Sequence, residues 1–352
     1  MGAPELSVTS EDGEVNHMDR FVVGTGRCGS TLLSLMLGEN RSMLSIFEFF
    51  NGLDMNRRFS SEPADGKEFA ALISQEHPFV TMVLRRGYEV PEITYPFGPG
   101  ARYKRDDGLP WTLVSTLPRL TDDPDSLFDE TVAFAASLPR QQLFLQYRQL
   151  FDWLTEHLGR TSWVERSGSS IDYLGSLHEL FPKARFLHLH RDGPETALSM
   201  REHHAYRLAI SLVFQLSPDE RSSHAALGKL DTGAPDDEND RISQLLKSRP
   251  PAEYFGRYWS QEIVHGYRAL PRLNADQYLE VRFEDLIANP ATVLREIGEF
   301  FEFGVDRDGW IDRAAGLVRG IPPTRFEKLP ADEQERLAEA CGVGMQLLGR
   351  DA

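Results

Sequence analysis

The sequence of 352 residues lacks the features that mark several classes of protein. It has only two cysteines, Cys28 and Cys341, which are too few for a disulfide framework and predict a protein of a reducing compartment. No stretch reaches the roughly 18 to 20 apolar residues of a membrane-spanning helix, and the first sixteen residues are too polar for a signal peptide. We therefore expect a cytoplasmic protein without an integral membrane segment.

Positive charge is also scarce. The 38 Lys and Arg residues are outnumbered by 54 Asp and Glu residues, which gives a formal net charge of −16. Broad binding to nucleic acid or to an acidic membrane needs a surplus of cationic side chains, so we expect neither. An anionic ligand must then be met by a local cationic pocket.

The hydrophobic content of the sequence is typical of a folded globular protein. Hydrophobic residues make up 41% of the sequence, which is enough for one large α/β domain or two smaller ones. Residues 1–16 show no apolar periodicity and are expected to be a disordered tail. No further break in composition and no internal repeat follows, so residues 17–350 are predicted to form a single domain.

Apolar patterns alternate between two periods along this domain. Short β-branched or alternating runs predict strands near 19–24, 42–47, 162–166, 185–190 and 277–282. Helical periodicity predicts helices over 30–39, 143–158, 170–181, 193–203, 253–270, 290–302 and 331–348. This alternation predicts a three-layer α/β fold, in which helices flank a central, mostly parallel sheet and ligands bind at the carboxyl ends of its strands.

The stretch FVVGTGRCGSTLLSLML, residues 21–37, passes from a strand through a glycine turn into a helix. The phosphate loop of nucleoside-triphosphatases, G-x-x-x-x-G-K-[ST], has the same length, but here Ser30 stands at the position of its Lys. The free N–H groups of the helix start, together with Arg27, favour a bound oxyanion. The stretch predicts a P-loop-like anion site that does not hydrolyse ATP, although a plain connection between strand and helix is the alternative.

Three further stretches follow predicted strands. They are SWVERSGSSIDYL at 162–174, FPKARFLHLHRDGPETALSM at 181–200 and LEVRFEDLIANPATVLREIGEFFEF at 279–303. With the glycine loop, and in this order, they resemble the signatures of the sulfotransferases that use 3′-phosphoadenosine 5′-phosphosulfate (PAPS). The first of the three is similar to the Glu-Lys-Ser stretch of the carbohydrate-type branch.

The resemblance implies a set of cofactor contacts. The glycine loop would bind the 5′-phosphosulfate, Arg191 and Ser199 the 3′-phosphate, and Arg166 would replace the Lys that contacts the bridging phosphate. Arg325 is predicted as a further contact. The loop residues in question are Gly26, Arg27, Cys28, Gly29, Ser30 and Thr31. PAPS is then the donor, adenosine 3′,5′-bisphosphate (PAP) the product, and no metal is required.

The proton acceptor is less directly implied. The catalytic His of the cytosolic steroid and phenol branch has no match, whereas bacterial and carbohydrate-type relatives have a proposed Glu base after the phosphosulfate loop. The stretch SMLSIFEFFNGL places Glu48 there. Two alternatives stay open: Glu48 caps a helix beginning near Phe49 or pairs with Arg27 or Arg166, and His203 or His204 acts as the base.

The implied function is in-line transfer of a sulfuryl group from PAPS to a hydroxyl of a small-molecule, carbohydrate or lipid acceptor, with Glu48, Arg27 and Arg166 as catalytic residues. One alternative is a P-loop small-molecule kinase, which Ser30 and the second phosphate motif disfavour. Another is a nucleotide-binding module without turnover. The sequence indicates no oligomeric state.

Acceptor binding is expected in segments near 51–150 and 203–252, which match none of the motifs. Within the first, residues 85–111 mix aromatic residues with five basic ones and predict either a lid over a polar alcohol or an ordinary surface excursion. His188 and His190, on one face of a predicted strand, are expected to be packed or hydrogen-bonded rather than to ligate a metal.

Overall fold

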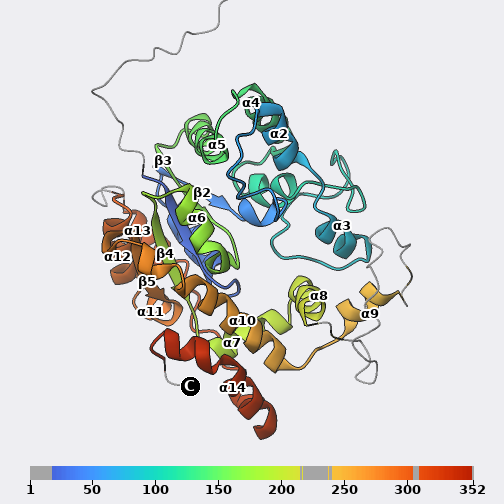
Figure 1. The fold of residues 1–352 in the computed structure, drawn as a ribbon, viewed down its shortest axis with the longest axis vertical. Helices are drawn as coiled ribbons and strands as arrows, with labels where there is room; N and C mark the ends of the chain where they lie inside the picture. The colour runs from blue at the N-terminus through green and yellow to red at the C-terminus, as the bar shows by residue number, and fades with distance from the viewer. Residues whose placement is uncertain (1–17, 215, 217–236, 238–239, 304–308, 351–352) are drawn as a thin grey trace, which may run out of the picture.

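The computed structural model describes residues 18–214, 216, 237, 240–303 and 309–350. The predicted tail at 1–16 and part of the predicted insertion near 203–252 lie outside these residues. The centre of the fold is a five-stranded sheet in the order β2-β3-β1-β4-β5, in which every pairing is parallel (Figure 1). The strands are β1 (Arg20–Val23), β2 (Met43–Phe47), β3 (Ser162–Arg166), β4 (Arg185–His190) and β5 (Tyr278–Arg282). The predicted α/β class and all five predicted strands are confirmed.

The strands are hydrophobic because both faces of the sheet are covered. Phe21 and Phe186 pack into a core on one face, whereas Val22 and Leu187 pack into a core on the other. Such strands read as continuous apolar runs, which is the pattern the sequence carries.

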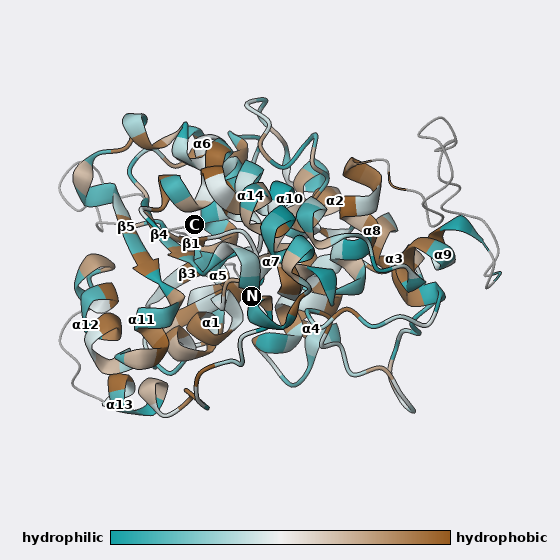
Figure 2. Cartoon of the chain, turned by 90° about the horizontal axis from the view of Figure 1, so that it is seen from below, coloured by the Kyte–Doolittle hydropathy of each residue, from teal (hydrophilic) through white to brown (hydrophobic). Residues whose placement is uncertain are grey.

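Helices cover both faces. The first core is closed by α2 (Gly66–Ser74), α4 (Pro124–Ser137), α5 (Leu143–His157) and α6 (Leu174–Leu180). The second is closed by α1 (Ser30–Gly38), α11 (Phe283–Ala288), α12 (Pro290–Phe300) and α13 (Trp310–Ala315). Figure 2 shows hydrophobic and hydrophilic residues mixed on outer helices such as α12, as expected where one helix face packs inward and the other meets solvent.

Two smaller clusters extend beyond the sheet. One joins α7 (Gly193–Arg201), α10 (Ala252–Tyr267) and α14 (Ala331–Leu347) around the completely buried Trp259. The other joins α3 (Pro78–Arg85), α8 (His204–Val213) and α9 (Arg241–Lys247). In the described part of the chain, no helix has the length and hydropathy that crossing a bilayer requires.

Most predicted helices are present, with two corrections. The stretch predicted as one helix over 170–181 is a 3₁₀ turn at Ser170–Tyr173 followed by α6, and α10 ends at Tyr267 rather than at 270. The helices α2, α3, α4, α8, α9, α11 and α13 are additional to those predicted. Several of them have 10 or fewer residues, so they carry few repeats of the helical period.

Candidate active site

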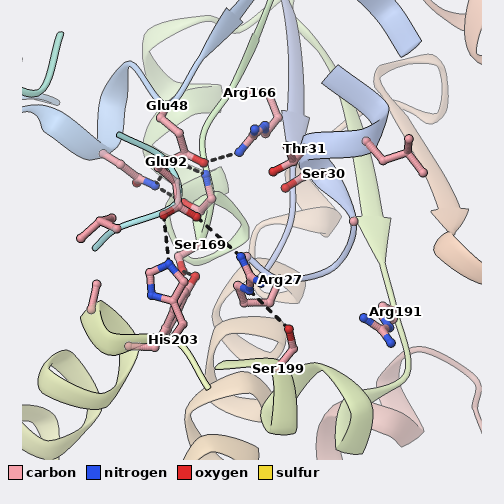
Figure 3. Close-up of a pocket in the computed structure, with 18 of the residues that line it drawn as sticks. Arg27, Ser30, Thr31, Glu48, Glu92, Arg166, Ser169, Arg191, Ser199 and His203 are labelled. Atoms are coloured by element: carbon pink, nitrogen blue, oxygen red, sulfur yellow. Dashed lines mark hydrogen bonds and ion pairs between the residues drawn. The ribbon is translucent and has the colours of Figure 1, made fainter. Parts of the chain in front are cut away.

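A cavity of about 870 Å³ opens at the carboxyl ends of the strands (Figure 3). Its wall includes the glycine loop, the residues that follow β2, β3 and β4, and the loop after α13. It brings together every predicted site residue except Cys28: Gly26, Arg27, Gly29, Ser30, Thr31, Glu48, Arg166, Arg191, Ser199 and Arg325.

Cys28 points away from this cavity. Its side chain is completely buried in the core beneath α1, and this burial raises the pKa of the thiol. A contact from Cys28 to a ligand would have to come from its backbone amide, and such a contact stays a prediction.

Residues with a side chain are poorly tolerated at the glycine positions of the loop. Gly26 has a φ of +71°, and a Cβ built at this position would lie 1.8 Å from the hydroxyl of Tyr206. Gly29, at φ +95°, leads directly into α1, whose first residue is Ser30 as predicted. The unpaired N–H groups of this first helical turn lie at the cavity, as an anion site requires.

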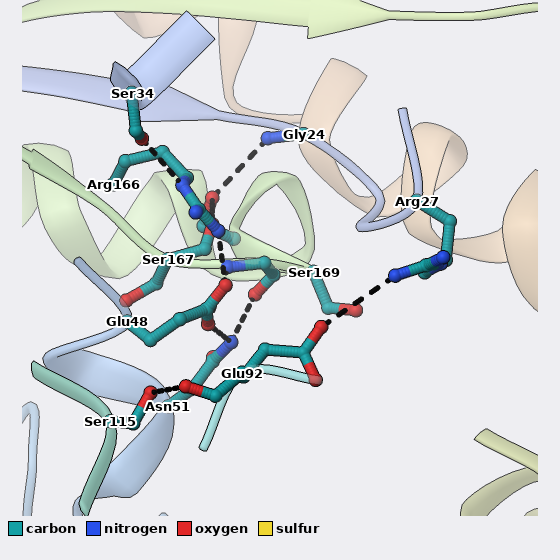
Figure 4. A network of polar contacts seen from close by, with 12 residues as sticks. Gly24, Arg27, Ser34, Glu48, Asn51, Glu92, Ser115, Arg166, Ser167 and Ser169 are labelled. Carbon is teal, nitrogen blue, oxygen red and sulfur yellow. Dashed lines mark hydrogen bonds and ion pairs between the residues drawn. The ribbon is translucent and has the colours of Figure 1, made fainter. Parts of the chain in front are cut away.

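Glu48 and Arg166 form an ion pair beside the loop (Figure 4). Glu48 Oε2 also accepts hydrogen bonds from Asn51 Nδ2 at 2.7 Å and from the Gly168 N–H at 2.9 Å. Arg166 Nε donates to Ser34 Oγ at 2.9 Å, whereas its buried Nη2 has no hydrogen-bond partner among the described residues. The pairing alternative for Glu48 is thus confirmed.

The helix-capping alternative for Glu48 is wrong. The nearby 3₁₀ turn, Phe50–Gly52, follows Phe49 and has no side-chain cap. Instead the Glu48 backbone is fixed at both ends: its N–H donates to the Arg166 carbonyl at 2.7 Å, and its carbonyl accepts from Trp111 Nε1 at 2.7 Å. These bonds hold Glu48 at a φ of +54°, an uncommon value for a residue with a side chain.

Arg27 and Ser169 have similar left-handed backbone conformations, with φ of +54° and +51°. Together with Glu48, they all line the cavity. Each such conformation costs about 1–3 kcal/mol and persists only where its surroundings enforce it. The surrounding structure therefore holds the loops around the cavity in one arrangement without a ligand.

Arg27 connects the two predicted phosphate motifs. Its Nε donates to Ser199 Oγ at 3.3 Å, and its Nη1 lies 3.7 Å from Glu92 Oε1. Glu92 Oε2 in turn lies 3.0 Å from His203 Nε2. Burial by itself would raise the pKa of Glu92, but the hydrogen bond and charge of His203 and the charge of Arg27 lower it to about 2.

A second group of cations comes from the end of β4 and from the loop after α13. Arg191 lines the cavity away from Glu48, Glu92 and His203 (Figure 3), and Arg319 and Arg325 from the loop after α13 line it too. In the described ranges none of the three has an ion pair with a carboxylate. Burial lowers the pKa of Arg191, opposed by the charges of Glu195 and Glu284, and the charge of Arg325 lowers it further.

The residues next to Arg191 explain its position. Asp192 caps α7 by accepting from the Glu195 N–H at 2.9 Å, and no ion pair between Arg191 and Asp192 is found among the described contacts. Glu195 Oε1 accepts from the N–H groups of Arg325 and Phe326 at 2.7 and 2.9 Å. Helix α7 therefore anchors the loop that carries Arg319 and Arg325.

The predicted histidines separate into three roles. His188 Nδ1 lies 2.7 Å from the Tyr278 hydroxyl and His190 Nδ1 accepts from Arg350 Nε at 3.2 Å, so the hydrogen-bonded interpretation of this completely buried pair is confirmed. His203 lines the cavity, whereas His204 packs against Tyr88, with ring centroids 4.7 Å apart. Within the described ranges, no three His, Cys, Asp or Glu residues are grouped as a metal site.

Several cavity residues escaped sequence reasoning. Glu92 lies in the segment 85–111, for which the prediction rested on five basic residues. Glu92 itself belongs to no motif and to no periodic pattern. Ser169 and Tyr206 meet across the cavity wall, with their hydroxyls 3.0 Å apart. Arg319 stands six residues before the predicted Arg325, in a stretch without regular structure.

The structure is an α/β fold in which a glycine loop, the two carboxylates of Glu48 and Glu92 and several guanidinium groups line one cavity. A sequence model of the sulfotransferase family matches residues 20–214 and 244–307, which is more than half of the chain. The chain therefore belongs to the sulfotransferase family, and membership supports a transferase of sulfuryl groups. No curated protein matches the chain.

Solved sulfotransferase structures are among those to which the chain is similar. The chain is 12% identical to a sulfotransferase domain from the curacin biosynthetic pathway, with a TM-score of 0.49 over 95% of this chain and 98% of that one. It is 17% identical to a sulfotransferase from Mycobacterium avium, with a TM-score of 0.46 over 95% and 78% of the two chains. A sulfotransferase from Alicyclobacillus acidocaldarius, also 17% identical, gives a TM-score of 0.39 over 96% and 98%.

Proposed function

We propose that the protein transfers a sulfuryl group from PAPS to a hydroxyl of an acceptor. The observation that carries this proposal is the presence, in one cavity, of two groups of guanidinium side chains from different segments. Arg27 and Arg166 lie in and beside the glycine loop, whereas Arg191 follows β4 and Arg319 and Arg325 lie in the loop after α13. A donor with a phosphosulfate at one end and a 3′-phosphate at the other matches both groups.

The residues present fit such a donor. The buried Nη2 of Arg166 has a hydrogen atom to donate and no partner in the described part of the chain. Arg191, Arg319 and Arg325 are likewise without a carboxylate partner there, and guanidinium groups bind phosphates through paired charge-assisted hydrogen bonds. When bound, PAPS supplies an activated sulfate, so the protein itself needs no covalent intermediate.

The chain contributes charge stabilisation and a proton acceptor. Arg27 and Arg166 are placed to stabilise the negative charge that grows on the departing phosphate. Glu48 Oε1 accepts one described bond, from Arg166, and so keeps a lone pair for the proton of an acceptor hydroxyl. The pKa of Glu92 is lowered to about 2, which makes this carboxylate a weak proton acceptor.

Calorimetric titration tests the donor. We expect PAP to bind at least about tenfold more tightly than AMP, and ATP to bind more weakly than PAP, because only PAP presents anions to both cationic groups. Turnover of PAPS in the presence of an acceptor, without added metal, then tests the reaction. Equal affinity for AMP and PAP, or transfer of phosphate from ATP, would overturn the proposal.

A further inference from the structure

The cavity has an apolar half that the donor contacts do not account for. It adjoins Glu48 and is formed by α3, α8 and the chain between residues 90 and 111. The side chains that line it are Phe79, Val80, Val90, Trp111, Ala205 and Ala209.

This apolar wall is backed by a hydrophobic cluster of its own. Val80, Val90 and Trp111 are buried together with Leu208 and Leu246, in a cluster separate from the two cores of the sheet. Since the wall is packed from behind, it is formed in the absence of a ligand. Covering it with hydrocarbon would remove apolar surface from water.

On this side His77, Asn51 and Trp111 are already bonded, whereas the buried Nδ1 of His203 has no hydrogen-bond partner in the described part of the chain. His77 accepts from the Val80 N–H at 3.3 Å through Nδ1, and its Nε2 lies 3.3 Å from the Asn51 carbonyl. Asn51 Nδ2 donates to both Glu48 and Gly168, and Trp111 Nε1 donates to the Glu48 carbonyl. A polyhydroxy acceptor would leave hydroxyl groups without partners here, which costs about 1–3 kcal/mol for each buried group.

The charges disfavour an anionic acceptor as well, because the five arginines that line the cavity are assigned to the donor in the proposed function. The two carboxylates Glu48 and Glu92 face the cavity, and the basic residues of segment 85–111 do not line it. Four of those five bind elsewhere: Arg86 to Asp240, Arg102 to Asp129, Arg105 to Glu89, and Arg85 to the Asp106 carbonyl. The segment does line the cavity, but with Val90, Glu92 and Trp111 rather than with its basic side chains.

We infer that the acceptor is an uncharged alcohol with an apolar body. This inference rests on the proposed sulfuryl transfer and narrows its acceptor. The hydroxyl lies at Glu48 and the hydrocarbon lies against the wall formed by Phe79, Val80, Val90 and Ala209. The acceptor oxygen forms a bond to sulfur as the bond from sulfur to the donor phosphate oxygen breaks. The hydroxyl proton passes to Glu48 and then to solvent, and the products are an alkyl sulfate and PAP.

Three six-carbon acceptors separate the possibilities in one assay with PAPS: hexan-1-ol, sorbitol and 6-hydroxyhexanoate. We expect turnover of hexan-1-ol, with kcat/KM at least about tenfold above the polyol and the carboxylate. Along butan-1-ol, hexan-1-ol and octan-1-ol, kcat/KM should rise by about fourfold for each methylene group that the wall covers. Preference for sorbitol or 6-hydroxyhexanoate, or no dependence on alkyl length, would overturn the inference.

Two substitutions on α8 test whether the apolar half of the cavity is where the alkyl chain binds. Ala209→Phe places a ring into the apolar half, whereas Val213→Phe adds one at a position that is 57% exposed and outside the cavity. Ala209→Phe should lower kcat/KM for octan-1-ol at least about tenfold and leave the Kd for PAP unchanged, and Val213→Phe should change neither. Equal kinetics in both variants would contradict the location. Failure of the wild-type protein to bind PAP would instead refute the proposed function itself.

Discussion

Glu48 and Arg166 form an ion pair in which the two side chains are only 5% and 2% exposed. Between them they also engage Ser34, Asn51 and Gly168, so the pair joins α1, the end of β2 and the end of β3. The pair fixes the Glu48 carboxylate at the cavity. It also makes each charge depend on the other, because a buried charge without its partner costs free energy of folding.

Glu48→Gln should lower kcat by at least about 10², because the amide cannot take the acceptor proton. Glu92→Gln, which alters a carboxylate with a pKa of about 2, should lower kcat by less than about tenfold. Steady-state kinetics with a saturating acceptor compare the two. If Glu92→Gln is the more damaging change, the base has been assigned to the wrong carboxylate.

Glu48→Gln should also lower the melting temperature, since it leaves the Arg166 charge buried without an anionic partner. Because PAP brings an anion to the same guanidinium, it should raise the melting temperature of this variant more than that of the wild type. Glu179→Gln, in the exposed pair with Arg272, is the matched control and should have little effect. Thermal scans with and without PAP measure both changes.

Arg191→Ala should weaken PAP binding by about 10- to 100-fold and AMP binding far less, because only PAP has the 3′-phosphate that this guanidinium is proposed to bind. Arg272→Ala, at a half-exposed surface position, controls for the loss of one positive charge. Calorimetry with the two nucleotides gives the comparison. An equal loss of affinity for AMP and PAP would place Arg191 elsewhere on the ligand.

Glu165 should make the stability of the protein fall as the pH rises. Burial raises the pKa of this carboxyl to about 8 from 4.5; the Ser167 hydrogen bond opposes the rise and the Glu48 charge adds to it. Between these values the folded state binds more protons than the unfolded state, so the contribution is full below about pH 4.5 and is lost towards pH 8.

Glu165→Gln should therefore flatten the decrease in the free energy of unfolding between pH 5 and pH 8, as measured by urea denaturation. Glu156→Gln, on an exposed face of α5, should keep the wild-type slope. A slope shared by all three proteins would show that Glu165 is not the group responsible.

Gly26→Ala should destabilise the protein and abolish tight PAP binding, because the new Cβ would overlap the Tyr206 hydroxyl at a φ of +71°. Gly38→Ala, at the end of α1, meets nothing within 4 Å and should be neutral or stabilising by up to about 1 kcal/mol. Denaturation and calorimetry on both variants test this. Wild-type PAP affinity in Gly26→Ala would show that the loop tolerates the displacement.

The sequence was informative where local chemistry decides the structure. β1 is buried throughout and reads as an apolar run, whereas the edge strand β5 alternates apolar and polar residues, and both patterns could be located without knowledge of the neighbouring strands. The glycine loop could be found because a left-handed turn before a helix requires glycine. Some local signals were nevertheless passed over: the capping box in which Asp65 and Glu68 bond each other's backbone N–H marks the start of α2.

Contacts between distant segments were decided only by the tertiary structure. Phe47 and Arg166 are aligned because β2 and β3 are neighbours in the sheet, and this alignment brings Arg166 to Glu48 across 118 residues. Nothing in either segment specifies the neighbour, because the order of parallel strands depends on how the crossover helices pack. The contact between Glu92 and His203, 111 residues apart, likewise depends on α8 packing near the chain that follows α3.

By itself, then, the sequence determined the family, the five strands and the residues that the cavity brings together, because local patterns of apolar, glycine and charged residues specify them. The tertiary structure decided the environment of those residues. It paired Glu48 with Arg166, placed Glu92 against Arg27, and turned the basic side chains of segment 85–111 away from the cavity. A side chain's partners depend on what packing brings within about 4 Å of it, and composition does not specify that distance.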